Sequence, residues 1–211
     1  GKTRAGAEFI RERVEGGQAR RIAIVAPTAA DARDTMIEGE SGLMGCSPTD
    51  FMPVYEPSKR RVTWPNGAIA TAFSADKPAR LRGPQHDTAW VDELAVWRYP
   101  EAWDNLLLGM RLGNPQIAVT TTPKPVRLVR QLLNDKAVRV TRGSTYDNRA
   151  NLAPSFLQKI IARYEGTRLG RQELHAELLS DVPGALWQRS MFDVRKEPPH
   201  RFDREGNDLG P

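Results

Sequence analysis

The stretch Thr88-Ala89-Trp90-Val91-Asp92-Glu93 decides the fold class of this 211-residue chain. Its first four residues are typical of a buried β-strand, and two carboxylates follow at the point where that strand should end. Two adjacent acids in this position are costly to bury unless a positive group compensates them. A magnesium-bound nucleotide provides that compensation, whereas the alternative interpretation is a strand that ends in a solvated Asp-Glu turn.

The chain begins with Gly1-Lys2-Thr3, which opens a helical pattern that extends to about Val14. These residues match the last three positions of the phosphate-binding loop G-x-x-x-x-G-K-[ST], in which backbone N–H groups at a helix N-terminus hold phosphates. In such a site Asp92 would hold Mg²⁺ through water, and Glu93 would orient and deprotonate the attacking water. The two features together indicate a P-loop nucleotide hydrolase far more strongly than either one alone.

The composition fits one domain with room for a tail, and it excludes several classes of protein. The 31 Lys and Arg against 26 Asp and Glu give a net charge of +5, which is compatible with a nucleic-acid partner. The single cysteine, Cys46, excludes an internal disulfide framework, and the three histidines do not approach a metal-ligand spacing. The longest apolar runs are too short to cross a membrane, so no membrane contact is expected. The sequence does not begin with Met and is interpreted as a fragment.

Hydrophobic runs predict a mainly parallel sheet with helices on both faces. Buried strands are expected at 21–26, 88–91 and 116–123, and a further strand at 137–141. The pair Asn66-Gly67, between apolar runs at 61–64 and 68–73, predicts a β-hairpin insertion, whereas residues 39–60 look irregular.

Helical periodicity predicts helices at 1–14, 100–112, 126–133 and 154–164, with another beginning after Thr167. Thr28 and Asp31 are spaced as a capping box. In the helix at 100–112 we expect the apolar positions to be core residues, namely Trp103, Leu106, Leu107 and Met110. Ligands of parallel sheets lie at the carboxyl ends of the strands, where the acid pair and residues 120–122 should meet in one site.

This pattern divides the chain into three parts. Residues 1–146 are predicted to be the P-loop core, without its N-terminal strand and the first half of the phosphate loop. Residues 147–183 are predicted to be a helical, lid-like part, and residues 184–211 a linker.

The motifs, taken in order, resemble the ATPase domain of tailed-phage large terminases, truncated at both ends. The similarity covers nearly the whole chain and is carried by GKTRAGAE at 1–8, APTAADAR at 26–33, EGESG at 38–42, RLRG at 80–83, WVDE at 90–93, TTTP at 120–123, GSTYDN at 143–148, QEL at 172–174 and GALW at 184–187. The resemblance implies a RecA-like fold of the ASCE class of P-loop NTPases, with ATP and Mg²⁺ as ligands.

The resemblance also implies roles for single residues. Gly1 and Lys2 would bind the β- and γ-phosphates, and Thr3 would contact Mg²⁺ together with Asp92. Glu93 would be the catalytic base. Residues 120–123 match the coupling motif, so Thr120 and Thr121 would sense the γ-phosphate.

Two arginines have competing interpretations. Arg82 matches the position of an arginine finger that reaches the ATP of a neighbouring subunit, with Arg80 as the competitor; the structural alternative is that Arg82 pairs with Asp87 or Glu93. Arg4 would sense the nucleotide, or would be a solvated side chain in the first helical turn.

The family assembles as a homo-oligomeric ring at the portal vertex and drives double-stranded DNA into the procapsid. The resemblance therefore implies double-stranded DNA, the portal protein and the small terminase subunit as partners. It places the protein in the host bacterial cytoplasm, transiently at the portal vertex. Because the acidic cluster of the family's nuclease domain is missing, no nuclease activity is expected from this chain.

Two rival functions remain open from the sequence. One is a helicase-like translocase ATPase, although 211 residues leave no room for a second RecA-like domain. The other is a non-catalytic DNA-binding or scaffold remnant. Basic clusters at 59–61 and at Arg163, Arg168 and Arg171 are either DNA-tracking surfaces or ordinary solvated faces.

Overall fold

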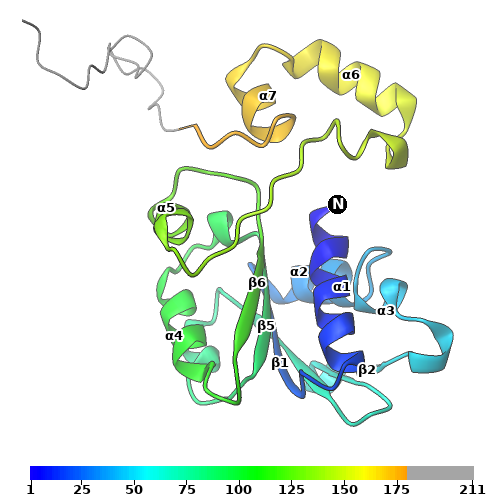
Figure 1. The fold of residues 1–211 in the computed structure, drawn as a ribbon, viewed down its shortest axis with the longest axis vertical. Helices are drawn as coiled ribbons and strands as arrows, with labels where there is room; N and C mark the ends of the chain where they lie inside the picture. Colours follow the sequence, from blue (N-terminus) through cyan, green and yellow to red (C-terminus); the bar gives the residue numbers. More distant parts are fainter. Residues whose placement is uncertain (180–211) are drawn as a thin grey trace, which may run out of the picture. The chain divides into compact units, whose positions relative to one another are not determined.

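A six-stranded sheet with strand order β2-β3-β4-β1-β5-β6 runs through the part of the chain that the computed structural model describes, residues 1–179 (Figure 1). The predicted linker at 184–211 and the motif at 184–187 lie outside the described residues. Strand β1 (Arg21–Ala26) is central and pairs in parallel with β4 (Ile69–Ser74) and with β5 (Thr88–Asp92). Strand β6 (Gln116–Thr120) continues the parallel sheet beyond β5.

The predicted hairpin extends the other edge of the sheet. Strand β3 (Arg61–Thr63) pairs antiparallel with β4, and β2 (Val54–Glu56) pairs antiparallel with β3. Strand β2 lies within the region expected to be irregular, so that expectation was wrong for these three residues. The reason is that β3 offers them an open edge, which a reading of local composition does not reveal.

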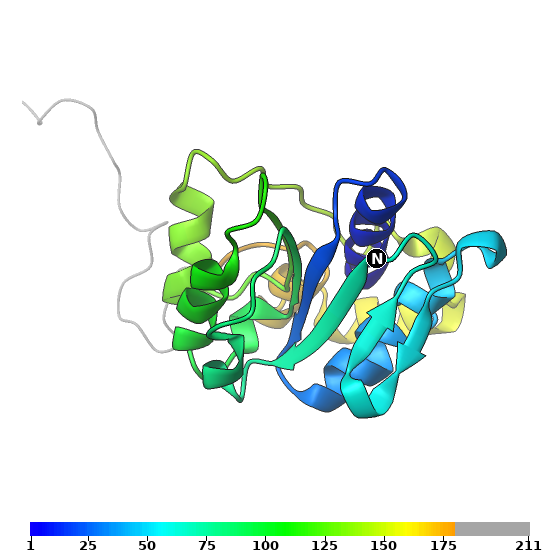
Figure 2. The same ribbon diagram turned by 90° about the horizontal axis from the view of Figure 1, so that it is seen from below.

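Two hydrophobic cores form on opposite faces of the sheet because side chains alternate along each strand. On one face, helix α1 (Lys2–Glu15), the π-helix η1 (Ala32–Ile37) and helix α3 (Leu43–Cys46) pack against Ile22, Ile24 and Trp90. On the other face, helices α4 (Glu101–Gly109) and α5 (Arg127–Asn134) cover the core that contains Val25 and Val91. Figure 2 shows α1 and the α4–α5 pair on opposite sides of the strands. The predicted mainly parallel sheet with helices on both faces is therefore present.

The remaining elements are mostly short, apart from α6. They are α2 (Ala29–Asp31), η2 (Thr49–Phe51), η3 (Pro57–Lys59), η4 (Pro78–Leu81), η5 (Leu94–Val96), η6 (Arg149–Asn151), α6 (Pro154–Tyr164) and α7 (Arg168–Glu173). The expected capping box is confirmed, since the Thr28 hydroxyl accepts from Asp31 N and the Asp31 carboxylate accepts from Thr28 N. Helices α6 and α7 lie in the part of the chain interpreted as lid-like. Among residues 1–179 no helix is long and apolar enough to span a bilayer.

Residues 137–141 do not form the predicted strand. Val138 and Val140 are 36% and 47% exposed, and the segment pairs with no strand in the described part of the chain. The alternation of Val, Arg and Val is suitable for a strand, but a strand forms only where a neighbour accepts its main-chain hydrogen bonds.

Two expectations about burial also need correction. Leu107 is 45% exposed, because α4 turns only Trp103 and Leu106 of the expected set into the core, while Met110 is half-buried. The strand expected at 116–123 was predicted to be buried, but β6 ends at Thr120, and Gln116 is exposed while the other four residues are half-buried, because β6 is the edge strand of the described sheet.

Candidate active site

The N-terminus of helix α1 is a position that favours anions. The helix begins at Lys2 with Gly1 as its N-cap, and neither a capping side chain nor an acidic residue occupies its first turn. The first N–H groups of such a helix have no intrahelical partner, and the helix dipole favours negative charge there. The backbone N–H groups at this helix end would therefore favour a phosphate group.

Gly6 allows α1 to lie directly on the sheet. A Cβ atom built at Gly6 would lie 2.1 Å from the indole of Trp90, a distance that no side chain tolerates. The Trp90 side chain is fully buried, and its Nε1 donates to Thr120 Oγ1 at 2.8 Å. The contact between Gly6 and Trp90 thus brings the first turn of α1 to the carboxyl ends of β5 and β6.

Asp92 ends β5 and is buried, with 6% of its surface exposed. Thr120 stands opposite it in register on β6 and donates from Oγ1 to Asp92 Oδ1 at 2.6 Å. Burial raises the pKa of Asp92; the Thr120 hydrogen bond opposes this shift, and the neighbouring Glu93 charge adds to it. A buried carboxylate in this state is stabilised by a cation, which favours its ionised form.

Glu93 turns sharply away from the strand. Its backbone is left-handed, with φ of 47° and ψ of 43°, which is costly for a residue with a Cβ. A hydrogen bond from Glu93 N to Thr120 O at 2.7 Å holds the turn. As a result, Glu93 Oε1 lies 3.4 Å from Lys2 Nζ. Lys2, predicted to bind phosphate, and Glu93, predicted to be the base, therefore form an ion pair.

Thr122 completes this contact. Its hydroxyl accepts from Lys2 Nζ at 2.6 Å, and its backbone N donates to Glu93 Oε2 at 3.4 Å. Sequence reasoning placed residues 120–122 at the site but gave roles only to Thr120 and Thr121. The period of two along a strand was a usable signal, because it places Thr120 and Thr122 on one face and Thr121 on the other.

Thr121 faces the opposite core. Its Oγ1 accepts from Ala95 N at 3.1 Å, at the start of the turn η5 that follows Glu93. Trp97, at the end of the same turn, donates from Nε1 to Asp92 O at 3.0 Å. The two strand ends are thus connected through side chains on both faces of the sheet.

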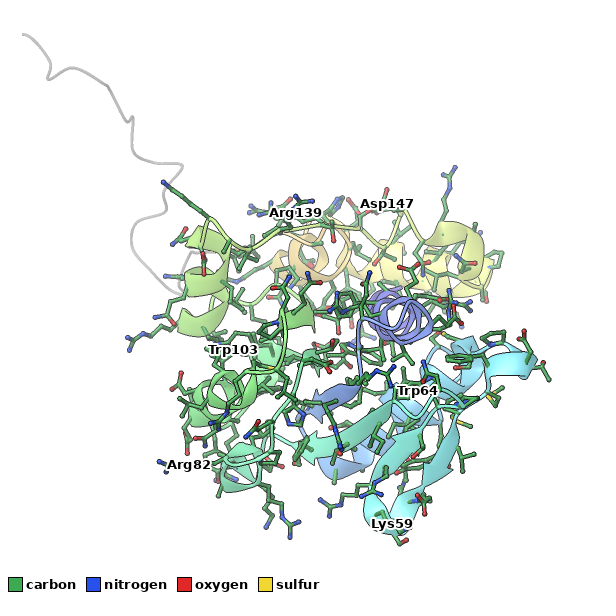
Figure 3. All side chains as sticks on the ribbon, turned by 60° about the horizontal axis from the view of Figure 1, so that its bottom comes forward. Lys59, Trp64, Arg82, Trp103, Arg139 and Asp147 are labelled. Atoms are coloured by element: carbon green, nitrogen blue, oxygen red, sulfur yellow. The ribbon has the colours of Figure 1, made fainter. Side chains whose placement is uncertain are left out.

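The two arginines named from the sequence do not contact the acid pair. Arg4 forms an ion pair with Glu8 at 3.0 Å, as a first-turn residue does with its i+4 neighbour. Arg82 is exposed at the end of η4, beside α4, and makes no ion pair within residues 1–179 (Figure 3).

The alternative that Arg82 pairs with Asp87 or Glu93 was therefore wrong. Asp87 Oδ2 accepts from the backbone N atoms of Arg20 and Arg21 at 2.9 and 2.8 Å, and Glu93 pairs with Lys2. Arg80, the competitor of Arg82, is also exposed and unpaired in the described chain. Either guanidinium is accessible to a second molecule.

The oxygen donors present fit a magnesium ion better than zinc. Among the described residues no group of three or more His, Cys, Asp or Glu side chains forms a metal cluster. Asp92 and Thr3 offer a carboxylate and a hydroxyl near the helix N-terminus. Magnesium is held in proteins by one or two such oxygens, together with water and substrate phosphates.

Comparisons with known proteins identify relatives of this fold. The sequence model of the family described as terminase large subunit, T4likevirus-type, N-terminal, matches residues 1–194. The ATPase domain of the large terminase of Thermus phage P74-26 has a TM-score of 0.59 and 16% identity, covering 85% of this chain and 84% of that one. No curated protein matches the chain by sequence.

The large terminase of a second, thermophilic bacteriophage is also similar. It has a TM-score of 0.65 at 13% identity over 80% of this chain, and its complex with ATP-gamma-S has a TM-score of 0.67 at 11% identity over 82%. In both, the chain spans 43% of the relative's length. At these identities the likeness establishes the fold, which is the RecA-like fold of these ATPase domains.

Proposed function

The chain belongs to the T4-like family of terminase large subunits, as part of its N-terminal region, and we propose that it is the ATPase motor for DNA packaging. One observation carries the proposal: the Lys2 ammonium, in the first turn of α1, contacts both Glu93 and Thr122. The large terminase of the thermophilic bacteriophage binds ATP-gamma-S, and we propose ATP as the ligand here. Its β- and γ-phosphates would lie against the first turn of α1 and Lys2.

Lys2 has two competing partners in this mechanism. Without nucleotide it neutralises Glu93, and a γ-phosphate attracts the ammonium more strongly because it carries more charge. Glu93 then loses its ion pair and is free to orient and deprotonate the attacking water. Hydrolysis is in this way restricted to a site that holds a triphosphate.

Asp92 and Thr3 would hold Mg²⁺, which supplies neutralisation of the charge that develops on the phosphates. The burial of Asp92 and its hydrogen bond to Thr120 fix the orientation of the carboxylate before nucleotide binds. Thr120 and Thr122 would then detect loss of the γ-phosphate through Asp92 and Lys2. Gly1 contributes the N-cap position of the phosphate-binding helix.

The motor would act as a ring on double-stranded DNA, with the portal protein and the small terminase subunit as partners. Arg82 is proposed to reach the ATP of the next subunit. In other NTPases such a contact raises the rate of nucleotide hydrolysis by about 10³–10⁵-fold. The exposure of Arg82 and its lack of an ion pair are compatible with this reach. The site of action would be the host bacterial cytoplasm, at the portal vertex during packaging.

The test is ATP turnover by the chain or, if its gene extends beyond these 211 residues, by the whole gene product. Glu93→Gln should lower turnover by about 10²–10⁴-fold and leave ATP binding in place. The exposed acid Glu101, changed to Gln, is the matched control and should turn over like the parent. No turnover by the parent would favour a scaffold, and equal measurable turnover by Glu93→Gln and the parent would exclude Glu93 as the base.

A further inference from the structure

The positive charge of the chain is concentrated in one segment. Residues 124–149 contain seven Lys and Arg and two acids, a net charge of +5, so the rest of the chain carries 24 of each sign. The segment comprises helix α5 and the connection to α6. The seven basic residues are Lys124, Arg127, Arg130, Lys136, Arg139, Arg142 and Arg149.

Helix α5 holds its basic residues in a fixed orientation. Val129 is buried, and Leu128 and Leu132 pack against the core between α4 and the sheet. Arg127 and Arg130 are exposed, and residues three apart are neighbours on one face of a helix. The apolar side anchors α5 while this arginine pair faces outward.

None of the seven basic side chains forms an ion pair within the described part of the chain. Of the other described cations, Arg4, Arg11, Arg33, Lys59 and Arg171 each have an acidic partner, whereas Arg80 and Arg82 do not. Arg139 lies on the connection beyond α5 and is exposed (Figure 3). A run of uncompensated cations favours a polyanionic partner, because each contact releases a counterion.

A short link connects α5 to the active site. Thr122 accepts from Lys2, and only residues 123–126 separate it from the first turn of α5. Pro123 and Pro125 restrict this link, since each fixes its own φ angle. Helix α5 also packs on η5, the turn that leaves Glu93. Helix α5 is therefore connected to the site in two ways: the link at 123–126 joins it to Thr122, and it packs on η5, which follows Glu93.

We propose that the outward face of α5, with the basic connection up to Arg149, binds the phosphate backbone of double-stranded DNA. This surface deepens the proposed motor function and rests on it. Because the cations are Lys and Arg side chains on an exposed surface, the contacts are to phosphates and are independent of base sequence.

The test is binding of a fluorescent duplex of about 30 base pairs, about three helical turns, to the parent and to Arg127→Ala/Arg130→Ala across a range of salt. The variant should bind about tenfold more weakly at low salt, and its slope of log affinity against log salt should fall by about 1.8. The matched control is Lys77→Ala/Arg111→Ala, which removes two exposed cations that lie outside this segment and form no ion pair within residues 1–179. This control should bind like the parent, and two duplexes of unrelated sequence should bind equally.

Any of three outcomes would contradict the proposed DNA-binding surface. Both double variants could weaken binding equally, or the slope of log affinity against log salt could be the same for Arg127→Ala/Arg130→Ala as for the parent. The third such outcome is that the parent does not bind duplex at low salt. In the last case the surface would belong to a protein partner. Circular dichroism of the variants checks their folding. ATP binding by the same samples separates this failure from failure of the motor proposal, because Lys2 and Glu93 are intact in all of them.

Discussion

Asp92 and Thr120 face each other in register across β5 and β6, and the Thr120 hydroxyl donates to Asp92 Oδ1 at 2.6 Å. The same oxygen of Thr120 accepts from Trp90 Nε1 at 2.8 Å. One hydroxyl thus links the indole on which α1 rests with the carboxylate that would hold the metal ion. Its removal should affect both the fold and the site.

Thr120→Val keeps the shape of the side chain but removes this hydroxyl. Asp92 and Trp90 then lose their shared partner in a buried position, which should lower the free energy of unfolding by about 1–3 kcal/mol. Urea unfolding followed by tryptophan fluorescence measures the change. Thr141→Val, at an exposed position, is the control and should be within about 0.5 kcal/mol of the parent. A stability equal to that of the control would show that the hydroxyl is dispensable.

Gly6→Ala should destabilise the chain, because the added methyl group would meet the Trp90 indole at 2.1 Å. Overpacking of this kind costs about 1–3 kcal/mol. Gly143→Ala is the control, since nothing lies within 4 Å of its Cβ position and its backbone is not left-handed. Thermal unfolding of both variants checks the prediction, and Trp90→Leu should recover part of the loss at Gly6. An unchanged melting temperature for Gly6→Ala contradicts the close contact of α1 with β5.

Glu93 should be replaced by Gly at less cost than by Ala. A left-handed residue with a Cβ costs about 1–2 kcal/mol, and glycine avoids this cost. Both variants lack the carboxylate, so both should lose ATP turnover, and their stabilities should differ by about 1 kcal/mol in favour of Gly. Denaturant unfolding of the pair isolates the backbone effect. Equal stabilities would mean that the turn relaxes without its side chain.

His86 should make the fold sensitive to mild acid. The ring is buried against Phe73 and its Nε2 has no hydrogen-bond partner in the described structure. Burial lowers the pKa of His86, and the nearby Asp87 opposes the shift only partly. The unfolded chain therefore takes up the proton first, at a pKa of about 6.5, and stability falls as the pH drops below that value.

The check is the unfolding free energy of the parent and of His86→Phe from about pH 7.5 to about pH 5. The parent should lose stability over this range, and the variant should lose less because it has no proton to take up there. His175→Phe is the control, because His175 is exposed beside Glu165. Parallel curves for the parent and His86→Phe would remove this histidine as the cause.

The parts of the fold that follow from local sequence were predicted well. The apolar runs gave β1 and β5, the Asn-Gly pair gave the hairpin, and the position of Asp92 and Glu93 at a strand end follows from the run before them. The prediction at 137–141 failed because strand formation depends on a distant partner. Leu107 failed for a similar reason, since helical spacing does not say which side of α4 meets the sheet.

The site was predictable in outline and not in its contacts. The motif order placed Lys2, Asp92 and Glu93 at one edge of the sheet, where the structure has them. The contact of Lys2 with Thr122, the left-handed turn at Glu93 and the packing of Gly6 on Trp90 depend on how α1 docks. Docking of a helix is decided by the shapes of two surfaces, which no single stretch of sequence contains.

The alternation of the three threonines at the end of β6 has a mechanical consequence. Thr120 and Thr122 contact the layer of α1, while Thr121 contacts the layer of α4 and α5 through Ala95. A shift of a single peptide at this strand end would change contacts with both helical layers at the same time. Removal of the Thr121 hydroxyl should therefore leave the contacts of Thr120 and Thr122 responsive to the state of the nucleotide. Removal of the Thr122 hydroxyl should in the same way leave the contact of Thr121 responsive.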